Sequence, residues 1–482
     1  MAVSHDQTSR LWTVQDEKRF FSVVLEAKER ALRTGISSIA CSELRWQSDF
    51  DWLQTFEQNP LDATLQVFWR NGEEARRTLA IAVRGPDEGR ESQSMTDIRV
   101  FWEQTTERLV GDAQDQAQFF CALTFDDSAV RDEVWKKWPR TLFELPRYLF
   151  KEDEFGVRLV IAIEVTEDGE VDDVVQMVTN ELSQLTERRV ERYIHKKKLT
   201  VSEASSAVQA QCVSATDKAH WQRAVAQVAE KIGQGEFAKV VMARRSVVRE
   251  SSRLSMKMIL QNLQEHYETG VVFAMMYASE VFVGATPERL VRSSNQQIQI
   301  DCLAGTTTRD QNPAQDEVLA QQLLASRKDQ EEHNHVLRGI LQDVNGCMSD
   351  ISFPETPNIR KLANVQHLYT PITGRMIEGS SILDFVDRLH PTPAVAGLPK
   401  YTAMQEIRRQ EDMDRGFYAG PIGFVDTHGD GAFNVALRCA LVRENEAVLF
   451  AGAGIVADSN PLAEWTETEW KMQPMQMALR QE

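Results

Sequence analysis

The stretch Ala451–Met472, AGAGIVADSNPLAEWTETEWKM, sets the organisation that we expect for the rest of the chain. The apolar run at 447–450 predicts a strand, and the small residues after it let the backbone approach another group closely. The sequence Asp458-Ser459-Asn460-Pro461 is typical of a helix start, with a side-chain cap and a proline in the first turn. A strand that leads through a close approach into a capped helix is therefore predicted here.

On that helix, Glu464, Glu467 and Lys471 are spaced at i, i+3 and i+7 and share one face, while Trp465 and Met472 can pack on a neighbouring face. Two carboxylates and an ammonium beside a glycine-rich backbone suit a divalent cation that holds an anionic substrate. A solvated helix face with ordinary ion pairs fits this stretch equally well, so the other motifs must decide.

Composition excludes several classes of partner. The 482 residues suffice for about two to four domains of roughly 150 residues, and the net charge of −18 repels nucleic acid and anionic membranes. An anionic substrate would therefore need local positive charge or a metal. Six scattered cysteines, the absence of an apolar signal core and the absence of a long apolar run predict a cytoplasmic protein with free thiols and no membrane partner.

The first part of the chain is predicted to be a mixed scaffold without a catalytic cluster. The expected elements are helices at 16–33 and 171–197 and strands at 64–70, 77–84, 119–125 and 157–165. The small, polar segment 202–217 marks a candidate boundary, which divides the chain into an N-terminal part, 1–205, and a catalytic part, 206–482. We expect the two parts to pack as one compact unit.

The second part alternates strands with long helices. The pattern predicts one long helix at 316–347 and strands at 237–244, 271–277, 281–283, 297–303, 420–425 and 431–442. This mixture predicts an α+β fold built on a large, mainly antiparallel sheet flanked by helices.

Lys239 and Glu288 are candidates for acid–base chemistry. Lys239 lies in the apolar run AKVVMA, where burial would lower the pKa of the amine and make it a general base. Glu288 follows a proline after a predicted strand, and an apolar wall would raise the pKa of its carboxyl and make it a general acid. For both, the local pattern alone favours an ordinary side chain that reaches solvent.

Glu332 and Arg438 are candidate ligands for a metal and a carboxylate. Val336 and Ile340 follow Glu332 at intervals of four residues, so Glu332 belongs to the buried face of its helix. A buried carboxylate needs a partner, and a metal ion can be that partner. In the predicted strand at 431–442, Arg438 shares a face with small residues, which leaves room for a carboxylate in front of the guanidinium. A salt-bridged core arginine is the alternative.

Two histidines are weighed as site residues. His390 lies in the proline-rich loop LHPTPAVAGLP, which is stiff enough to hold the imidazole near a substrate oxygen. A lone histidine is nevertheless more often structural than catalytic, and His367, which precedes Tyr369, is predicted to be structural.

Taken together, these motifs resemble the chorismate-utilising enzymes, and most closely the isochorismate synthases. The segments that carry the resemblance follow the family order and extend over 219–472: KVVMAR, GATPERL, LAGTTTR, SRKDQEEH, LHPTPAVAG, DRGFYAGPIG, FNVALRCA and the stretch quoted first. Eight motifs in one order are highly specific. Farther upstream, WPRTLFELPRYLF matches the family, whereas FFCALTFDD departs from its glycine-rich version outside the site.

The resemblance implies the chorismate-binding fold and a Mg²⁺-dependent, reversible isomerisation of chorismate to isochorismate. Water would attack ring carbon C2 while the C4 hydroxyl leaves. Lys239 would activate the water and Glu288 would protonate the departing hydroxyl. The other implied roles are Mg²⁺ binding by Glu332 and Glu467 with Glu464 nearby, carboxylate binding by Arg438, Lys471, Gly305 and Thr306, and a pocket wall at His390.

Two positions distinguish this chain from other members of the family. Ammonia-using relatives typically lack a lysine at the Lys239 position, and aminodeoxychorismate enzymes carry a nucleophilic lysine where this chain has Ala304. Water is therefore the expected nucleophile, and no glutamine amidotransferase subunit is expected. The alternatives are a salicylate synthase, which shares both residues and goes on to eliminate pyruvate, a catalytically inactive homologue, and a simple Mg²⁺-binding module.

The remaining expectations concern pathway and assembly. The long N-terminal part is more similar to the menaquinone-pathway type than to the shorter siderophore type. A monomer is expected, since the sequence shows neither a coiled coil nor an interface stripe.

Overall fold

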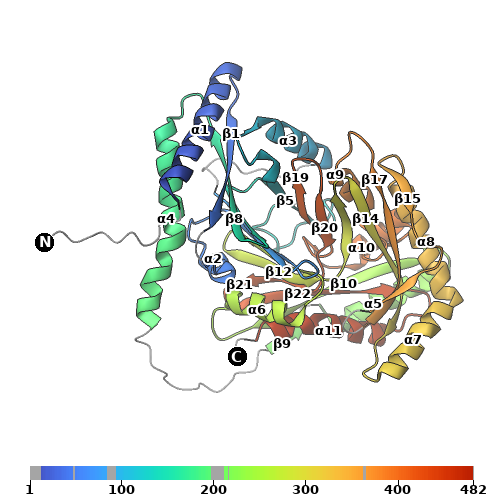
Figure 1. The fold of residues 1–482 in the computed structure, drawn as a ribbon. Coiled ribbons are helices and arrows are strands. Elements are labelled where there is room, and N and C mark those ends of the chain that lie inside the picture. The colour runs from blue at the N-terminus through green and yellow to red at the C-terminus, as the bar shows by residue number, and fades with distance from the viewer. Residues whose placement is uncertain are drawn as a thin grey trace.

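The computed structural model describes residues 12–46, 49–83, 94–196, 211–214, 216–361 and 365–480 (Figure 1). Within these ranges the chain forms two large sheets with helices packed around them, which confirms the α+β prediction. Strand pairing is antiparallel except between β1 and β4. None of the described helices is both long enough and apolar enough to cross a lipid bilayer.

The larger sheet is built from strands of both parts of the sequence. In spatial order its strands are β18 (Gly397–Leu398), β10 (Lys239–Arg249), β22 (Glu446–Ile455), β21 (Cys439–Arg443), β12 (Glu280–Thr286), β11 (Val271–Tyr277), β2 (Leu65–Asn71), β3 (Arg76–Ala82), β7 (Tyr148–Asp153), β8 (Gly156–Val165), β1 (Ser38–Trp46) and β4 (Leu109–Val110), with β9 (Gln211–Ser214) on β10.

The smaller sheet lies against the larger one. Its order is β15 (Met348–Ser352), β17 (Val365–Met376), β14 (Gln297–Thr308), β13 (Arg289–Ser294), β20 (Gly431–Val435), β19 (Pro421–Asp426), β5 (Gln118–Leu123) and β6 (Thr141–Glu144), with β16 (Asn358–Lys361) on β17.

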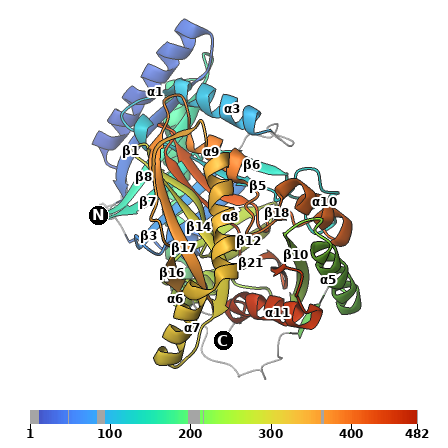
Figure 2. The same ribbon diagram turned by 90° about the vertical axis from the view of Figure 1, so that its right-hand side faces the viewer.

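Helices cover the outer faces of both sheets. They are α1 (Val14–Thr34), α2 (Trp52–Gln58), α3 (Met95–Arg108), α4 (Val171–Lys196), α5 (Lys218–Gly233), α6 (Met256–His266), α7 (Pro313–Ala325), α8 (Arg327–Asp343), α9 (Ile382–Leu389), α10 (Lys400–Gln410) and α11 (Pro461–Ala478). Figure 2 shows α8 lying across β14 and β17, and α11 lying beside α5.

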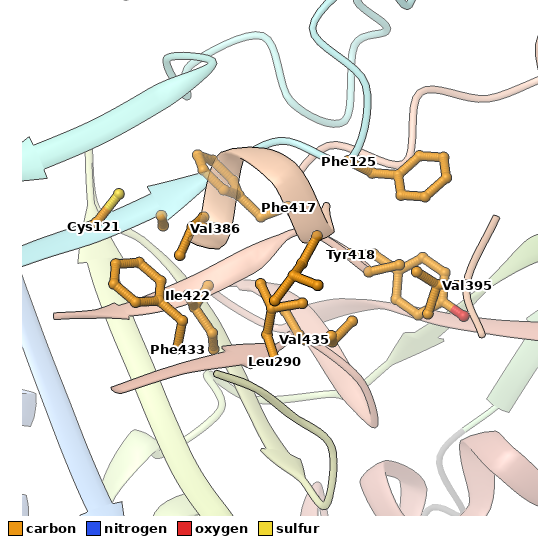
Figure 3. Close-up of a cluster of buried hydrophobic side chains, with 14 of the residues drawn as sticks. Cys121, Phe125, Leu290, Val386, Val395, Phe417, Tyr418, Ile422, Phe433 and Val435 are labelled. Atoms are coloured by element: carbon orange, nitrogen blue, oxygen red, sulfur yellow. The ribbon is translucent and has the colours of Figure 1, made fainter. Parts of the chain in front are cut away.

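One apolar core lies between the sheets and under α5, α8, α9 and α10, and a second core lies on the outer face of the larger sheet. Figure 3 shows part of the first core, where Ile422 and Phe433 of the smaller sheet lie near Phe417 and Tyr418. The second core is covered mainly by α1, α2, α4, α6 and α11, which contribute buried residues to it. This double burial explains why many strands carry apolar residues on both faces.

The two predicted parts of the chain are joined within both sheets. β2 pairs with β11 along its whole length, from Leu65 opposite Tyr277 to Asn71 opposite Val271. β5 pairs with β19 in the smaller sheet. The boundary predicted at 205/206 thus separates two segments whose strands complete each other's sheets.

Three sequence predictions of local structure are wrong. The strand predicted at 431–442 is two strands, β20 and β21, in different sheets, and the predicted alternation of faces stops at their junction. The helix predicted at 316–347 is divided by Ser326, whose hydroxyl accepts from Asp329 N and starts α8. Of the linker predicted at 202–217, residues 202–210 and 215 lie outside the described residues, while 211–214 form β9.

We predict that a chain ending at residue 205 will not fold stably. Without β11 and β19, the edges of β2 and β5 are unpaired, and the inner face with Trp69, Leu149 and Val160 loses its apolar cover. Near-UV circular dichroism and urea unfolding, compared with the full chain, measure this. A cooperative unfolding transition of the 1–205 segment alone would contradict the prediction.

Candidate active site

Lys239 begins β10, and its side chain lies against the backbone of β22. A Cβ atom at Gly454 would lie only 2.9 Å from Lys239 Cε, so no side chain fits there without displacing the lysine. The amine Nζ is 3.0 Å from Glu332 Oε1 on α8, and the two side chains are 21% and 26% exposed. Lys239 is therefore held by a carboxylate instead of extending freely into solvent. The close approach predicted for the AGAG segment is the packing of the Lys239 side chain against Gly454.

Lys471, on α11, also binds the backbone of β22. Its Nζ donates to the carbonyl of Gly452, at 2.8 Å, and lies 2.6 Å from Glu467 Oε1 one turn earlier on α11. Burial lowers the pKa of Lys471, Glu467 opposes this shift, and the nearby cations Arg438 and Lys239 lower the pKa further. The helix cap at Asn460 and the shared face of the acidic residues are as predicted.

Hydrogen bonds fix the backbone of Glu288, which lies in the turn between β12 and β13. Its N–H donates to Thr286 Oγ1 at 3.2 Å, and its carbonyl accepts from Val435 N at 3.0 Å and from Asn434 Nδ2 at 3.1 Å. The half-buried carboxyl is therefore carried by a hydrogen-bonded junction between the two sheets, whereas the local pattern alone favoured a side chain that reaches solvent.

The carboxyl of Glu288 is poised between its two protonation states. Burial raises its pKa to about 7, although the positive charges of Arg438, Lys239 and Lys471 oppose the shift. A carboxylic acid that still holds its proton near neutral pH can donate it to a leaving group. The sequence prediction of an acid with a raised pKa agrees with this environment.

Arg438 lies where the chain passes from β20 in the smaller sheet to β21 in the larger sheet. Its φ of 49° is in the left-handed region, and its carbonyl accepts from Ala285 N at 3.2 Å. The positive charge of Arg438 opposes the raised pKa of Glu288 and adds to the lowering of the pKa values of Lys471 and His367. Arg438 thus joins the site from a strained junction, not from the continuous strand that was predicted.

Gly305 and Thr306 lie at a bulge in β14. The pairing with β17 shifts between Ala304 and Thr306, and Gly305 has a φ of 75°, which favours glycine. Thr306 Oγ1 lies 2.9 Å from His367 Nδ1 on β17. The predicted AGT segment therefore belongs to a site that also contains His367.

The predicted metal ligands are brought together only in part. Glu464 and Glu467 lie one turn apart on α11, and burial raises the pKa of Glu464, with the neighbouring Glu467 contributing. Two crowded carboxylates of this kind favour a nearby cation. Glu332, however, is paired with Lys239, and among the described residues no group of three or more His, Cys, Asp and Glu side chains is placed to hold a metal ion.

His390 follows α9 and is bound to a neighbouring segment. Its Nε2 is 3.1 Å from the carbonyl oxygen of Phe125, and its Nδ1 is buried without a hydrogen-bond partner. Burial lowers its pKa to about 4, so the ring is neutral. Its hydrogen bond connects it with Phe125 and not with the paired lysines and carboxylates.

Two residues that the sequence reasoning missed belong to this region. His367 was predicted to be structural, yet its pKa is influenced by Lys471, Arg438 and Lys239. The hydroxyl of Tyr418 would lie 3.1 Å from a Cβ at Gly452, beside the carbonyl that Lys471 binds. Tyr418 lies in the DRGFYAGPIG motif. His367 could have been found if its strand had been predicted to pair with the strand that contains the AGT segment.

A separate pocket of about 630 Å³ lies between the sheets, lined by residues that include Arg76, Lys151, Arg292, His428 and Asp430. None of the predicted site residues lines it. The chemistry inferred above therefore does not belong to this cavity.

Comparison with known proteins identifies the family. The sequence model described as chorismate binding enzyme matches residues 26–480. The chain therefore belongs to the chorismate binding enzyme family, as the motifs indicated.

The names of individual relatives are consistent with this family. The chain is similar to the isochorismate synthase MenF of Bacillus subtilis (strain 168), with 38% identity over 263 residues, 55% of this chain and 56% of that protein. It is also similar to the isochorismate synthase MenF of Pasteurella multocida (strain Pm70), with 32% identity over 347 residues, 70% of this chain and 76% of that protein. The chain spans little more than half the length of the Bacillus relative.

Among solved structures, the fold is similar to that of MenF, the menaquinone-specific isochorismate synthase from Escherichia coli. The TM-score is 0.74 with 22% sequence identity, over 95% of this chain and 100% of that chain. This likeness shows that the two chains share a fold over nearly their whole lengths.

We predict that Glu288→Gln stabilises the protein at pH 8 but has little effect at pH 5. The wild-type carboxyl has a folded-state pKa of about 7, above its ordinary value of 4.5, so its contribution to stability is present at low pH and is lost as the pH rises from 4.5 through 7. Glutamine never ionises and avoids this loss.

Thermal unfolding at the two pH values measures the effect. The exposed Glu265→Gln on α6 is the control and should show no such pH dependence. Equal melting-temperature changes for Glu288→Gln at pH 5 and pH 8 would contradict the prediction.

Proposed function

We propose that this protein is an isochorismate synthase, a hydroxymutase-type isomerase that interconverts chorismate and isochorismate. The observation that carries the proposal is that the positive charges of Lys239, Arg438 and Lys471 all act on the Glu288 carboxyl, while the Lys239 amine is paired with Glu332. One base, one acid near its pKa and an excess of cations suit the displacement of a hydroxyl from a dianionic ring. The family and the names of the relatives support this choice of substrate.

In the proposed reaction, Lys239 takes a proton from the water that attacks C2. The amine must react in its neutral form, so its ion pair with Glu332 must open first. Glu288 gives its proton to the C4 hydroxyl, which leaves as water while the ring double bond shifts. One water enters and one leaves, so the step is an isomerisation and is reversible. The carboxylate left on Glu288 is stabilised by the cations Arg438, Lys239 and Lys471.

Arg438 and Lys471, with Gly305 and Thr306, would bind the two carboxylates of chorismate, Arg438 offering a fork of N–H donors and Thr306 a hydroxyl. Glu467 and Glu464 would hold Mg²⁺, joined by Glu332 once its ion pair with Lys239 has opened. Hard carboxylate oxygens are the preferred protein ligands of Mg²⁺, and the crowded pair Glu464 and Glu467 favours a cation. When bound, the metal would supply positive charge against the ring carboxylate.

We further propose a role of the menaquinone-pathway type, in the cytoplasm, by a monomer that needs no amidotransferase subunit. The pathway is supported by the MenF relatives and by the full-length match to a menaquinone-specific structure. Five cysteines, Cys41, Cys121, Cys302, Cys347 and Cys439, are free and buried, as in a reducing compartment. Light scattering on a sizing column tests the monomer.

The protein, incubated with chorismate and Mg²⁺ but without ammonia or glutamine, is expected to form isochorismate in equilibrium with chorismate. Lys239→Ala should lower kcat/KM by roughly 10²–10⁴-fold, the usual contribution of a general base, and EDTA should abolish turnover. Chromatographic separation of the products measures both effects.

The other outcomes are equally informative. Salicylate with pyruvate would identify a salicylate synthase, and no product with any nitrogen source would indicate an inactive homologue. Mg²⁺ binding that is independent of chorismate and without turnover would indicate a metal-binding module. If Lys239→Ala converted chorismate at the wild-type rate, Lys239 would not be the base.

The pH dependence of kcat/KM should fall on the alkaline side through about pH 7. Glu288 must be protonated to donate, and the protonated fraction decreases as the pH rises past its pKa of about 7. Initial rates in overlapping buffers measure this limb. Glu288→Gln should have low activity without that limb, and a wild-type limb that persists in this variant would assign the ionisation to another group.

A further inference from the structure

The first helix, α1, carries apolar side chains on two faces. Its inward face packs in the second core through the buried residues Phe20, Val23, Val24, Ala27 and Ala31. Another face is exposed and also carries apolar side chains, which we call the outer stripe: Val14 (55% exposed), Phe21 (36%), Leu25 (40%) and Leu32 (59%). Figures 1 and 2 both show α1 at the periphery of the molecule. Because both faces are apolar, the outer stripe could not be recognised from the sequence alone.

The spacing of the outer stripe is symmetric. Its residues follow one another at intervals of seven, four and seven positions, so at 3.6 residues per turn they form one line along the helix. Position 23 is the midpoint of this line, since Val14 and Leu32 lie nine residues from it and Phe21 and Leu25 lie two residues from it. Such a line fits an antiparallel copy of itself, with Val14 against Leu32 and Phe21 against Leu25.

Charged residues flank the outer stripe with complementary signs. By helical geometry, Lys18 and Glu29 lie on one side of the stripe, and Glu17 and Lys28 lie on the other side. A two-fold axis perpendicular to the helix makes each side face the same side of the second copy. Lys18 would then meet Glu29 of the second copy, at nearly the same level along the axis. Glu17 would likewise meet Lys28 of the second copy.

Most of these charges are available for such contacts. Lys28 Nζ lies 3.3 Å from Glu170 Oε2, on a side chain that is 73% exposed. Among the described residues, no ion pair is formed by Glu17, Lys18 or Glu29. An anionic lipid surface selects lysine and arginine beside an apolar face, whereas here acids and bases are equal in number. The pattern therefore fits a surface that carries the same alternation of charge.

We propose that the outer stripe of α1 binds α1 of a second copy of this chain, antiparallel, in a weak two-fold dimer. A parallel pair would also align the stripe, but it would place like ends of the two helix dipoles together. One helix from each copy makes a small interface, of the transient class below about 1,200 Å². The dimer therefore forms only in concentrated solution, and the monomer proposed above is the form present in a dilute activity assay.

Sedimentation equilibrium of the full chain, from about 1 µM to about 300 µM, tests the association. The average mass should rise from that of one chain toward that of two. Leu25→Glu puts a charge into the apolar line twice per dimer and should weaken association roughly 100-fold or more. Val100→Glu, at a 43% exposed apolar position of α3, is the matched control and should leave the association unchanged. Neither substitution should alter the melting temperature, because both positions are exposed.

The charges and the direction of pairing are tested separately. Lys18→Glu places like charges opposite each other and should weaken the dimer roughly 3- to 10-fold, and adding Glu29→Lys should restore it. Under mild oxidation, a mixture of the Val14→Cys and Leu32→Cys proteins should form a disulfide between the two variants, whereas each variant alone should not. The wild-type chain is the control for cross-linking through its own cysteines.

The mass of one chain at every concentration would overturn the proposal, as would undiminished association of Leu25→Glu. Disulfides formed by each cysteine variant alone, and not between the two, would exclude the antiparallel arrangement. Binding of a persistently monomeric chain to vesicles of anionic phospholipid, if abolished by Leu25→Glu, would assign the outer stripe to a lipid surface instead. None of these measurements uses chorismate, so they remain decisive even if the proposed function fails.

Discussion

Electrostatic repulsion among Lys239, Arg438 and Lys471 is the constraint on which the rest of the site depends. The three positive charges all act on Glu288 and on His367. Such a group is unfavourable in a folded protein unless carboxylates offset it. Glu332 on α8 pairs with Lys239, and Glu467 pairs with Lys471 within α11, so part of the excess charge is balanced.

The fold brings these charges together by close packing of backbone and by changes of sheet. Gly454 leaves space for the lysine side chain, and the carbonyl of Gly452 accepts from a second ammonium. The left-handed conformation of Arg438 carries the chain from one sheet to the other, next to the turn that holds Glu288. Since each cation comes from a different segment, the surrounding sheets must be rigid, and their two large apolar cores provide that rigidity.

The sequence was informative where chemistry is local. The cap at Asn460 and the spacing of residues on α11 could be predicted because they depend only on neighbouring residues. The end of the strand before Arg438 could not be predicted, because the alternation of apolar and polar residues does not show which of two sheets a residue joins. The break at Ser326 was missed although Ser326 and Asp329 form a local cap. The position of His367 depends on a bulge in a partner strand, so no pattern within its own segment could place it.

The order of the chain has a consequence for protein synthesis. When the ribosome has translated as far as Ile455, every described strand of both sheets has been made, yet α11 and its residues Glu464, Glu467 and Lys471 are still missing. A nascent chain can therefore assemble its sheets before its charges are complete. A product interrupted at this point would lack two carboxylates and one cation of the candidate site, together with the apolar residues that α11 contributes to the second core.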